Sequence, residues 1–224
     1  MIYKKIGIMG GTFNPIHYGH LALANTAYNQ FGLDTVWVMP SKVPPHKQHV
    51  ELISANHRIE MIKAALHGEP FLQLSLFEMH RSGYTYTYDT LQKLHERYPN
   101  TQFYFIMGGD SLRSFASWRK PDVIAKLCIL LVANRGLVVS EELSEQMARV
   151  TDQFQAQIGL LNIPRMSVSS SEIRRRIADG EAVRELIPPA VEHYIRTHQL
   201  YGCSGFDSHT ERMDDHAEKT GGAE

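Results

Sequence analysis

The sequence contains few cysteines, little net charge and no long hydrophobic run. Cys128 lies in an apolar run and Cys203 in a polar segment, which argues against a disulfide framework and favours a reducing compartment. The formal net charge of −1 gives no general attraction to nucleic acid or to anionic membranes. No stretch approaches the length of a transmembrane helix, and residues 1–5 lack the apolar core of a secretory signal. We therefore expect a soluble, cytoplasmic protein that binds neither nucleic acid nor membranes.

Short apolar runs alternate with helical periodicity along most of the 224 residues. The runs predict strands at 5–9, 35–39, 72–76, 102–107, 128–132 and 163–168. Apolar residues spaced by three and four predict helices at 21–31, 59–66, 91–98, near Pro121, at 143–154, and from about 170 and 188. Gly32 is expected to end the first helix, and Ser54 and Ser140 to cap two others. This alternation predicts an α/β fold, in which a doubly wound parallel sheet carries helices on both faces in a single domain.

Two segments differ from this pattern. In residues 203–224, Gly, Ser, Asp, Glu, His and Lys predominate and apolar residues nearly vanish, so we expect a folded domain of residues 1–202 and a disordered tail of 203–224. Residues 41–50 contain two prolines, two lysines and two histidines. That composition fits an ordered functional loop or a lid, and it fits a plain surface loop equally well.

Unusual polar clusters follow the predicted strands at their carboxyl ends. They combine glycines, histidines, hydroxyls and basic residues at 10–20, 44–47, 82–90, 108–111 with Trp118 and Arg119 beyond, 134–136 and 169–174. Ligands of open α/β sheets bind beyond the carboxyl ends of the strands. We therefore expect these clusters to share one site.

The first cluster has the features of a phosphate site. Gly10 and Gly11 let the backbone approach a phosphate closely, Thr12 can donate a hydroxyl, and the helix that follows offers free N–H groups. The cluster is neither a dinucleotide-binding fingerprint nor a P-loop. His17 and His20, spaced by three, share one helix face. Because no third ligand is nearby in the sequence, we interpret the pair as oxyanion-binding rather than metal-binding, with solvated helix caps as the alternative.

The last cluster repeats this arrangement. The serines at 169–171 open a helix and can either cap its N–H groups or leave them for a phosphate. Arg174, one turn further, can fork onto phosphate oxygens, whereas Arg175 and Arg176 are expected to face solvent. A well-capped surface helix is the alternative.

At these two clusters the sequence resembles the nucleotidyltransferase superfamily. Residues 11–20, Gly-Thr-Phe-Asn-Pro-Ile-His-Tyr-Gly-His, resemble its G-x-F-x-P-x-H-x-G-H signature, and residues 168–174, Val-Ser-Ser-Ser-Glu-Ile-Arg, resemble its partner I-S-S-T-x-I-R. Asn14 stands where Asp is usual and Ser171 where Thr is usual, and each keeps a hydrogen-bonding group. Residues 44–47, 86–91 and 109–118 are similar to the bacterial nicotinate-nucleotide adenylyltransferases, a resemblance that runs from about residue 4 to 201.

This resemblance implies a Rossmann-like fold and transfer of AMP from ATP, with Mg²⁺, to nicotinate mononucleotide in NAD biosynthesis. It implies that pyrophosphate leaves and that no covalent enzyme intermediate forms. The residues present agree, because they include cations and hydrogen-bond donors but no activated nucleophile. A homo-oligomer is compatible with the sequence, and no metal site made by the protein is expected.

The resemblance also implies residue roles. The expected catalytic residues, which also contact ATP, are His17, His20 and Arg174. The other expected ATP-binding residues are Gly10, Gly11, Thr12, Phe13, Gly108, Ser169 and Ser170. The expected acceptor-binding residues are Lys47, Thr87, Asp110, Trp118, Arg119 and Arg135, with Asp110 on a ribose hydroxyl and Thr87 and Trp118 on the nicotinate ring.

Two other functions are compatible with parts of the sequence. Phosphopantetheine adenylyltransferases share the superfamily signatures but are shorter and lack the segments similar to 44–47 and 86–90. A regulatory module that binds nucleotides without catalysis is the alternative from another class, and intact His17, His20 and Arg174 argue against it.

Overall fold

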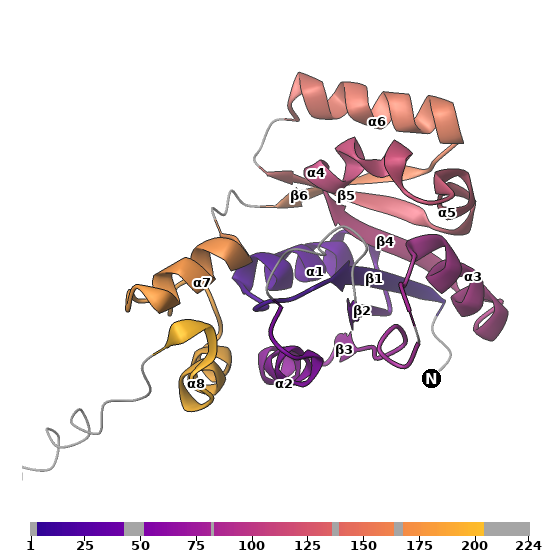
Figure 1. Cartoon of the computed structure of the whole chain (residues 1–224). Helices are drawn as coiled ribbons and strands as arrows, with labels where there is room; N and C mark the ends of the chain where they lie inside the picture. Colours follow the sequence, from indigo (N-terminus) through magenta and orange to yellow (C-terminus); the bar gives the residue numbers. More distant parts are fainter. Residues whose placement is uncertain (1–3, 43–51, 82, 136–138, 164–167, 204–224) are drawn as a thin grey trace, which may run out of the picture.

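The computed structural model describes residues 4–42, 52–81, 83–135, 139–163 and 168–203, apart from the side chain of Arg135. Its centre is a six-stranded sheet in which every pair of neighbouring strands is parallel (Figure 1). The strands are β1 (Lys5–Gly11), β2 (Thr35–Pro40), β3 (Leu72–Leu74), β4 (Gln102–Gly108), β5 (Ile129–Arg135) and β6 (Ile158–Ile163). The predicted parallel α/β sheet is therefore confirmed.

The strand order creates a crevice at one edge of the sheet. The order is β3-β2-β1-β4-β5-β6, so the chain builds outward from β1 in one direction and then from β4 in the other. The connections on the two sides of the β1–β4 pair therefore leave toward opposite faces. In doubly wound folds the crevice at such a switch point, beyond the carboxyl ends of the strands, is where ligands bind.

Helices cover both faces of the sheet, as predicted. They are α1 (Tyr18–Phe31), α2 (Ala55–Leu66), α3 (Thr87–Arg97), α4 (Gly109–Arg113), α5 (Pro121–Leu127), α6 (Glu141–Phe154), α7 (Ser170–Ala178) and α8 (Pro189–Thr197), with short 3-10 helices η1 (Phe115–Ser117) and η2 (Leu200–Gly202). One core layer lies under α1, α2, α7 and α8, and the other under α3 to α6. Figure 1 shows α4 and α6 on one side of β5 and β6, with α7 and α8 together at another end of the molecule.

Alternation along the strands supplies these two core layers. In β2 the side chains of Val36 and Val38 enter the layer beneath α1 and α2, whereas Trp37 and Met39 enter the opposite layer. All four are buried, as expected for a central strand that is covered on both faces. No helix among the described residues is long and apolar enough to cross a bilayer.

The predicted helix boundaries at three positions are confirmed by local contacts. Gly32 follows α1 in the left-handed conformation, with φ 57° and ψ 48°. The Ser54 side chain accepts a hydrogen bond from the His57 N–H, and the Ser140 side chain accepts one from the Leu143 N–H.

The sixth strand lies earlier in the chain than predicted. The predicted range of 163–168 is wrong, because β6 ends at Ile163 and pairs with β5 from Ile158 onward. Gly159 lies inside this strand, where a glycine is unfavourable unless packing requires it. Here packing does require it, since a Cβ at Gly159 would lie 2.5 Å from the ring of Phe31 on α1.

The proposed tail falls almost entirely outside the described residues. Residues 204–224 are not described, so the division at residue 202 stays a prediction. Cys203, its first residue, still packs against the core and donates its N–H to the Leu200 carbonyl.

Candidate active site

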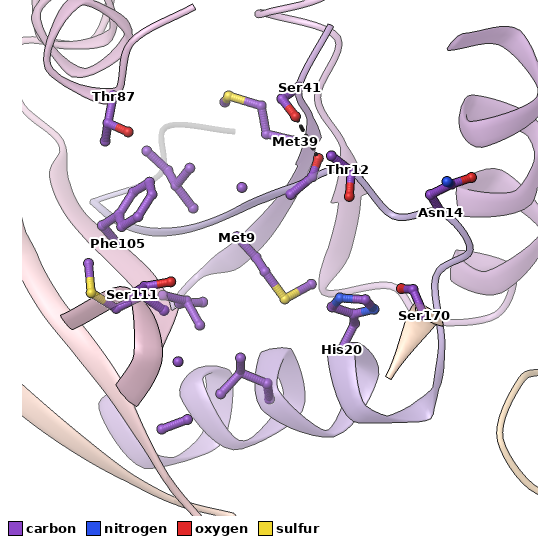
Figure 2. A pocket seen from close by; sticks show the side chains of 18 of the residues that line it. Met9, Thr12, Asn14, His20, Met39, Ser41, Thr87, Phe105, Ser111 and Ser170 are labelled. Atoms are coloured by element: carbon purple, nitrogen blue, oxygen red, sulfur yellow. Dashed lines mark hydrogen bonds between the residues drawn. The ribbon is translucent and has the colours of Figure 1, made fainter. Parts of the chain in front are cut away.

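A cavity of about 680 Å³ opens at the crevice between β1 and β4. Its floor is formed by side chains from the ends of these two strands, including Ile8, Met9, Phe105 and Met107. Figure 2 shows Thr87 and Phe105 at one end of the cavity and His20, Asn14 and Ser170 at the other, with Met9 between them. The two ends therefore offer different chemistry.

The backbone after β1 forms one wall of the cavity. Gly10 and Gly11 end the strand, and the Gly11 carbonyl accepts hydrogen bonds from the N–H and the hydroxyl of Ser41 at 2.9 and 3.2 Å. A Cβ on Gly11 would lie 3.1 Å from the Phe13 ring, so this turn is packed tightly from below. Phe13 is buried and has a positive φ of 48°. These contacts hold the cavity-facing glycines in one position.

The two histidines stand together at the start of α1. His17 is the N-cap residue, and its N–H donates to Nδ1 of His20 at 3.3 Å. The two rings stack, with centroids 3.7 Å apart, and Phe13 meets the His20 ring edge-on at 5.0 Å. Because Nδ1 of His20 accepts a hydrogen bond, a neutral His20 ring carries its proton on Nε2. His20 is thereby fixed as a donor through Nε2.

The second signature docks directly onto the first. The Ser170 hydroxyl donates to the Pro15 carbonyl at 2.9 Å, and Arg174 Nη1 donates to the Asn14 carbonyl at 2.9 Å. Ser169 caps α7 by accepting from the Glu172 N–H. These bonds join residues 155 and 160 positions apart in the chain. Both signatures therefore line one end of the cavity, as the sequence predicted.

Arg174 differs from the two arginines that follow it. Arg175 and Arg176 form ion pairs with Glu172, Glu181 and neighbouring acids on the surface of α7. Among the described residues Arg174 has no such pair, and it lines the cavity. A neutral carbonyl orients its guanidinium without cancelling its charge, so the charge remains available to an anion.

Asn14 is held from the C-terminal side of the fold. The Tyr201 hydroxyl donates to Asn14 Oδ1 at 2.7 Å, and burial raises the pKa of Tyr201. Tyr201 therefore stays a neutral donor at physiological pH. An amide at position 14 accepts this bond without bringing a negative charge to the end of the cavity where His20 and Ser170 lie, which we call the phosphate end after its predicted role.

The opposite end of the cavity is aromatic. The Trp118 ring lies edge-on to Phe105 at 5.9 Å, and its Nε1 donates to the Ser114 hydroxyl at 3.3 Å. The Arg119 guanidinium carbon lies 4.7 Å from the centroid of the Tyr86 ring. Thr87 is the first residue of α3, so the first N–H groups of that helix lie close to its hydroxyl. This end suits a flat ring that carries hydrogen-bond acceptors.

Most of the predicted site residues meet in the cavity. Those that line it are Gly10, Gly11, Thr12, His17, His20, Thr87, Gly108, Trp118, Arg119, Ser169, Ser170 and Arg174. Phe13 supports the site from beneath instead. Asp110 lies at the start of α4 with 83% of its side chain exposed, and it pairs with Arg113. Lys47 and the Arg135 side chain lie outside the described residues, so their roles stay predictions.

Two charged residues of the site, one buried and one partly buried, were not predicted. Arg58 on α2 is 1% exposed and donates to the carbonyls of Thr12 and Ser41 at 2.9 and 2.8 Å, which joins the loops that follow β1 and β2. Glu78 lines the cavity near Thr85 and Thr90. Neither residue has a sequence signal of its own, although an arginine on the apolar stripe of a helix is unusual enough to attract notice.

The described residues contain no cluster of three or more His, Cys, Asp and Glu side chains that could hold a metal ion. Both carboxylate oxygens of Glu78 already accept hydrogen bonds from threonines. Any Mg²⁺ at this site would therefore find its oxygen ligands mainly on bound phosphates and water.

Comparisons with known proteins agree with this geometry. Residues 8–176 match the model of the Cytidylyltransferase-like family. The "Probable nicotinate-nucleotide adenylyltransferase" of Lachnoclostridium phytofermentans is 41% identical over 198 residues, covering 88% of this chain and 99% of that protein. The nicotinate-nucleotide adenylyltransferase of Bacillus subtilis is 39% identical, covering 88% and 98%. The structure of Plasmodium falciparum nicotinic acid mononucleotide adenylyltransferase complexed with NaAD has a TM-score of 0.73 at 26% identity and covers 88% of this chain and 97% of that one.

Proposed function

The chain belongs to the nicotinate-nucleotide adenylyltransferases of the cytidylyltransferase-like family, and we propose that it transfers AMP from ATP to nicotinate mononucleotide in NAD biosynthesis. A phosphate oxygen of the acceptor attacks the α-phosphorus of ATP, and the bond from that phosphorus to the bridging oxygen of pyrophosphate breaks. The products are nicotinate adenine dinucleotide and pyrophosphate. The observation that supports this most is the docking of the second signature onto the first beside the two histidines.

The phosphate end stabilises the transferring group. His20 donates through Nε2, His17 stacks behind it, and Arg174 offers an uncancelled positive charge. Thr12, Ser169 and Ser170 hold the triphosphate, together with the backbone of Gly10 and Gly11, and Phe13 supports this wall. Because the attacking phosphate is already an anion, the residues need only position it and neutralise charge.

The aromatic end receives the acceptor. Trp118 stacks on the pyridine ring, while Thr87 and the backbone beside Arg119 donate to its carboxylate. Lys47 contacts a phosphate, Arg135 binds the acceptor, Gly108 binds ATP, and Asp110 binds a ribose hydroxyl. These four assignments rest on the family resemblance.

Bound with ATP, Mg²⁺ would supply charge neutralisation on the triphosphate. The protein's own contribution is the set of histidine, arginine and hydroxyl donors at that end of the cavity. A cytoplasmic location and assembly into a homo-oligomer stay predictions from sequence composition and family.

A pyrophosphate-release assay tests this proposal. The full chain is supplied with ATP, Mg²⁺ and in turn nicotinate mononucleotide, nicotinamide mononucleotide or phosphopantetheine. We expect release that depends on nicotinate mononucleotide. Release with phosphopantetheine instead would assign the chain to the other adenylyltransferase branch, and no release with any acceptor would favour a regulatory module.

A further inference from the structure

Glu78 is the only acidic residue among the described residues that line the cavity. It lies beyond β3, in a turn where the N–H of Met79 donates to the Leu76 carbonyl and the N–H of Arg81 to the Glu78 carbonyl. A carboxylate is unexpected in a cavity that is to receive three phosphates and an anionic ring, because like charges repel. Its presence therefore requires a reason.

Both oxygens of the Glu78 carboxylate are occupied by threonine hydroxyls. Thr85 donates to Oε2 at 3.1 Å, and Thr90 donates to Oε1 at 2.8 Å. The Thr90 hydroxyl also accepts from Arg81 Nη1 at 3.0 Å, so its one proton must point toward Glu78. Arg81 in turn pairs with Asp89. The direction of the bond from Thr90 to Glu78 is thus set by the arginine behind it.

The two threonines lie on either side of the acceptor end. Thr85 precedes Thr87, the first residue of α3, by two positions, and Thr90 follows it by three, inside the helix. Both are buried, with 6% and 3% exposed. Within this segment the Tyr86 carbonyl accepts the N–H groups of Asp89 and Thr90. The Glu78 carboxylate therefore links Thr85, before the start of α3, to Thr90 in its first turns, and fixes the orientation of the first turn of the helix.

We propose that Glu78 is a positioning residue for the acceptor: by holding Thr85 and Thr90 together, it fixes Thr87 and the first N–H groups of α3 in the position that binds the acceptor's ring carboxylate. This inference rests on the proposed function and adds the hydrogen bonds that hold its acceptor site in position. Glu78 does not contact the acceptor's reacting atoms in this role. Burial raises the pKa of Glu78, and the two threonines and Arg81 oppose that effect.

The test compares Glu78→Ala with Glu78→Gln. Alanine removes both bridges, and we expect KM for nicotinate mononucleotide to rise about tenfold or more, with KM for ATP changed by less than about twofold. Glutamine keeps an acceptor for Thr90 and offers its NH₂ to the Thr85 hydroxyl, which can accept instead of donate. We expect its KM for nicotinate mononucleotide to stay within about threefold of that of the unmodified enzyme.

Three results would overturn the inference. An unchanged acceptor KM in Glu78→Ala would show that the bridge does not aim the site. An equal rise in the acceptor KM in Glu78→Ala and Glu78→Gln would show that the charge of Glu78 matters and its hydrogen bonds do not. A parallel rise in KM for ATP would show general damage to the cavity. If Glu78→Ala fails to fold, it is replaced by Thr90→Val, which removes one of the two hydrogen bonds to Glu78. An unchanged KM for nicotinate mononucleotide in Thr90→Val overturns the inference as well.

Two controls complete the design. Val150→Ala removes packing from the core layer that also contains α3, at a residue that does not line the cavity, and should leave both KM values unchanged. The unmodified enzyme is assayed first with nicotinate mononucleotide. If it does not use that acceptor the proposed function fails, whereas if it does and Glu78→Ala behaves normally only the present inference fails.

Discussion

Replacing His20 tests whether the first signature performs chemistry or only caps a helix. In the structure Nδ1 of His20 accepts the His17 N–H at 3.3 Å, which is the cap, and the proposed function adds donation from Nε2 to a phosphate oxygen. Loss of a helix cap costs about 0.5–2 kcal/mol of stability. Loss of one donor that acts in the transition state costs about 2.7–4 kcal/mol in activation free energy, or a factor of about 10² to 10³ in kcat. The capping role therefore affects folding stability by a small amount, whereas the catalytic role affects kcat by a larger one.

Three variants separate these roles. His20→Ala should lower kcat by about 10²-fold or more and lower Tm slightly. His20→Asn keeps an acceptor near the Nδ1 position but no donor at the Nε2 position, so Tm should recover while kcat stays low. His20→Gln can place its NH₂ near the Nε2 position and should recover part of kcat. The assays are pyrophosphate release at saturating substrates and thermal unfolding.

Either of two results would refute this reasoning. If His20→Ala turns over within about threefold of the unmodified enzyme, well below the effect of losing a transition-state donor, His20 has no part in charge stabilisation. If His20→Asn instead restores both Tm and kcat, the histidine acts only as a cap. Each result is distinguishable because stability and turnover are measured on the same preparations.

Three further predictions follow from the structure. Arg58→Met should lower the free energy of unfolding by about 3 kcal/mol, because two partly buried carbonyls lose a charged donor, and denaturant unfolding measures this. Trp118→Ala should weaken the binding of nicotinate mononucleotide and nicotinamide mononucleotide alike. Thr87→Val should narrow the difference in kcat/KM between them, which we expect to favour nicotinate mononucleotide by about 10²- to 10⁴-fold in the unmodified enzyme. Equal kcat/KM values for the two acceptors in the unmodified enzyme would contradict this. Deleting residues 204–224 should leave Tm and turnover almost unchanged, since their composition offers little apolar surface to bury, and a large drop in either would show that they pack on the body or on a partner.

The sequence was most informative where local chemistry decides the structure. Gly32, Ser54 and Ser140 act through their own neighbours, so their roles as helix boundaries could be predicted and are confirmed. The sixth strand was predicted too late in the chain, and it contains Gly159, a residue type that usually weakens a strand. Gly159 is required by the ring of Phe31, which lies far away in the sequence, and no local pattern reveals that contact.

The same distinction applies to the site. The residues of the two signatures could be predicted because each group is compact in sequence, and the carboxyl-edge rule brought them together. The supporting residues could not. Arg58 donates to carbonyls, which carry no side-chain signal, and Glu78 is recognisable only once Thr85 and Thr90 are seen on its two oxygens. Their importance lies in contacts that only the folded chain makes.

The way in which the cations are held explains how one α-helix can contain both structural and functional arginines. Arg175 and Arg176 lie against acids, where their charge is cancelled and stabilises the surface of α7. Arg174, next to them in sequence, is oriented by the Asn14 carbonyl, and Asn14 is itself neutral and held by Tyr201. An ion pair with a neighbouring acid, such as those of Arg175 and Arg176, would offset the charge of the guanidinium. Carbonyls and amides give direction without that loss, so the phosphate end of this cavity keeps its positive charge for the anion that it binds.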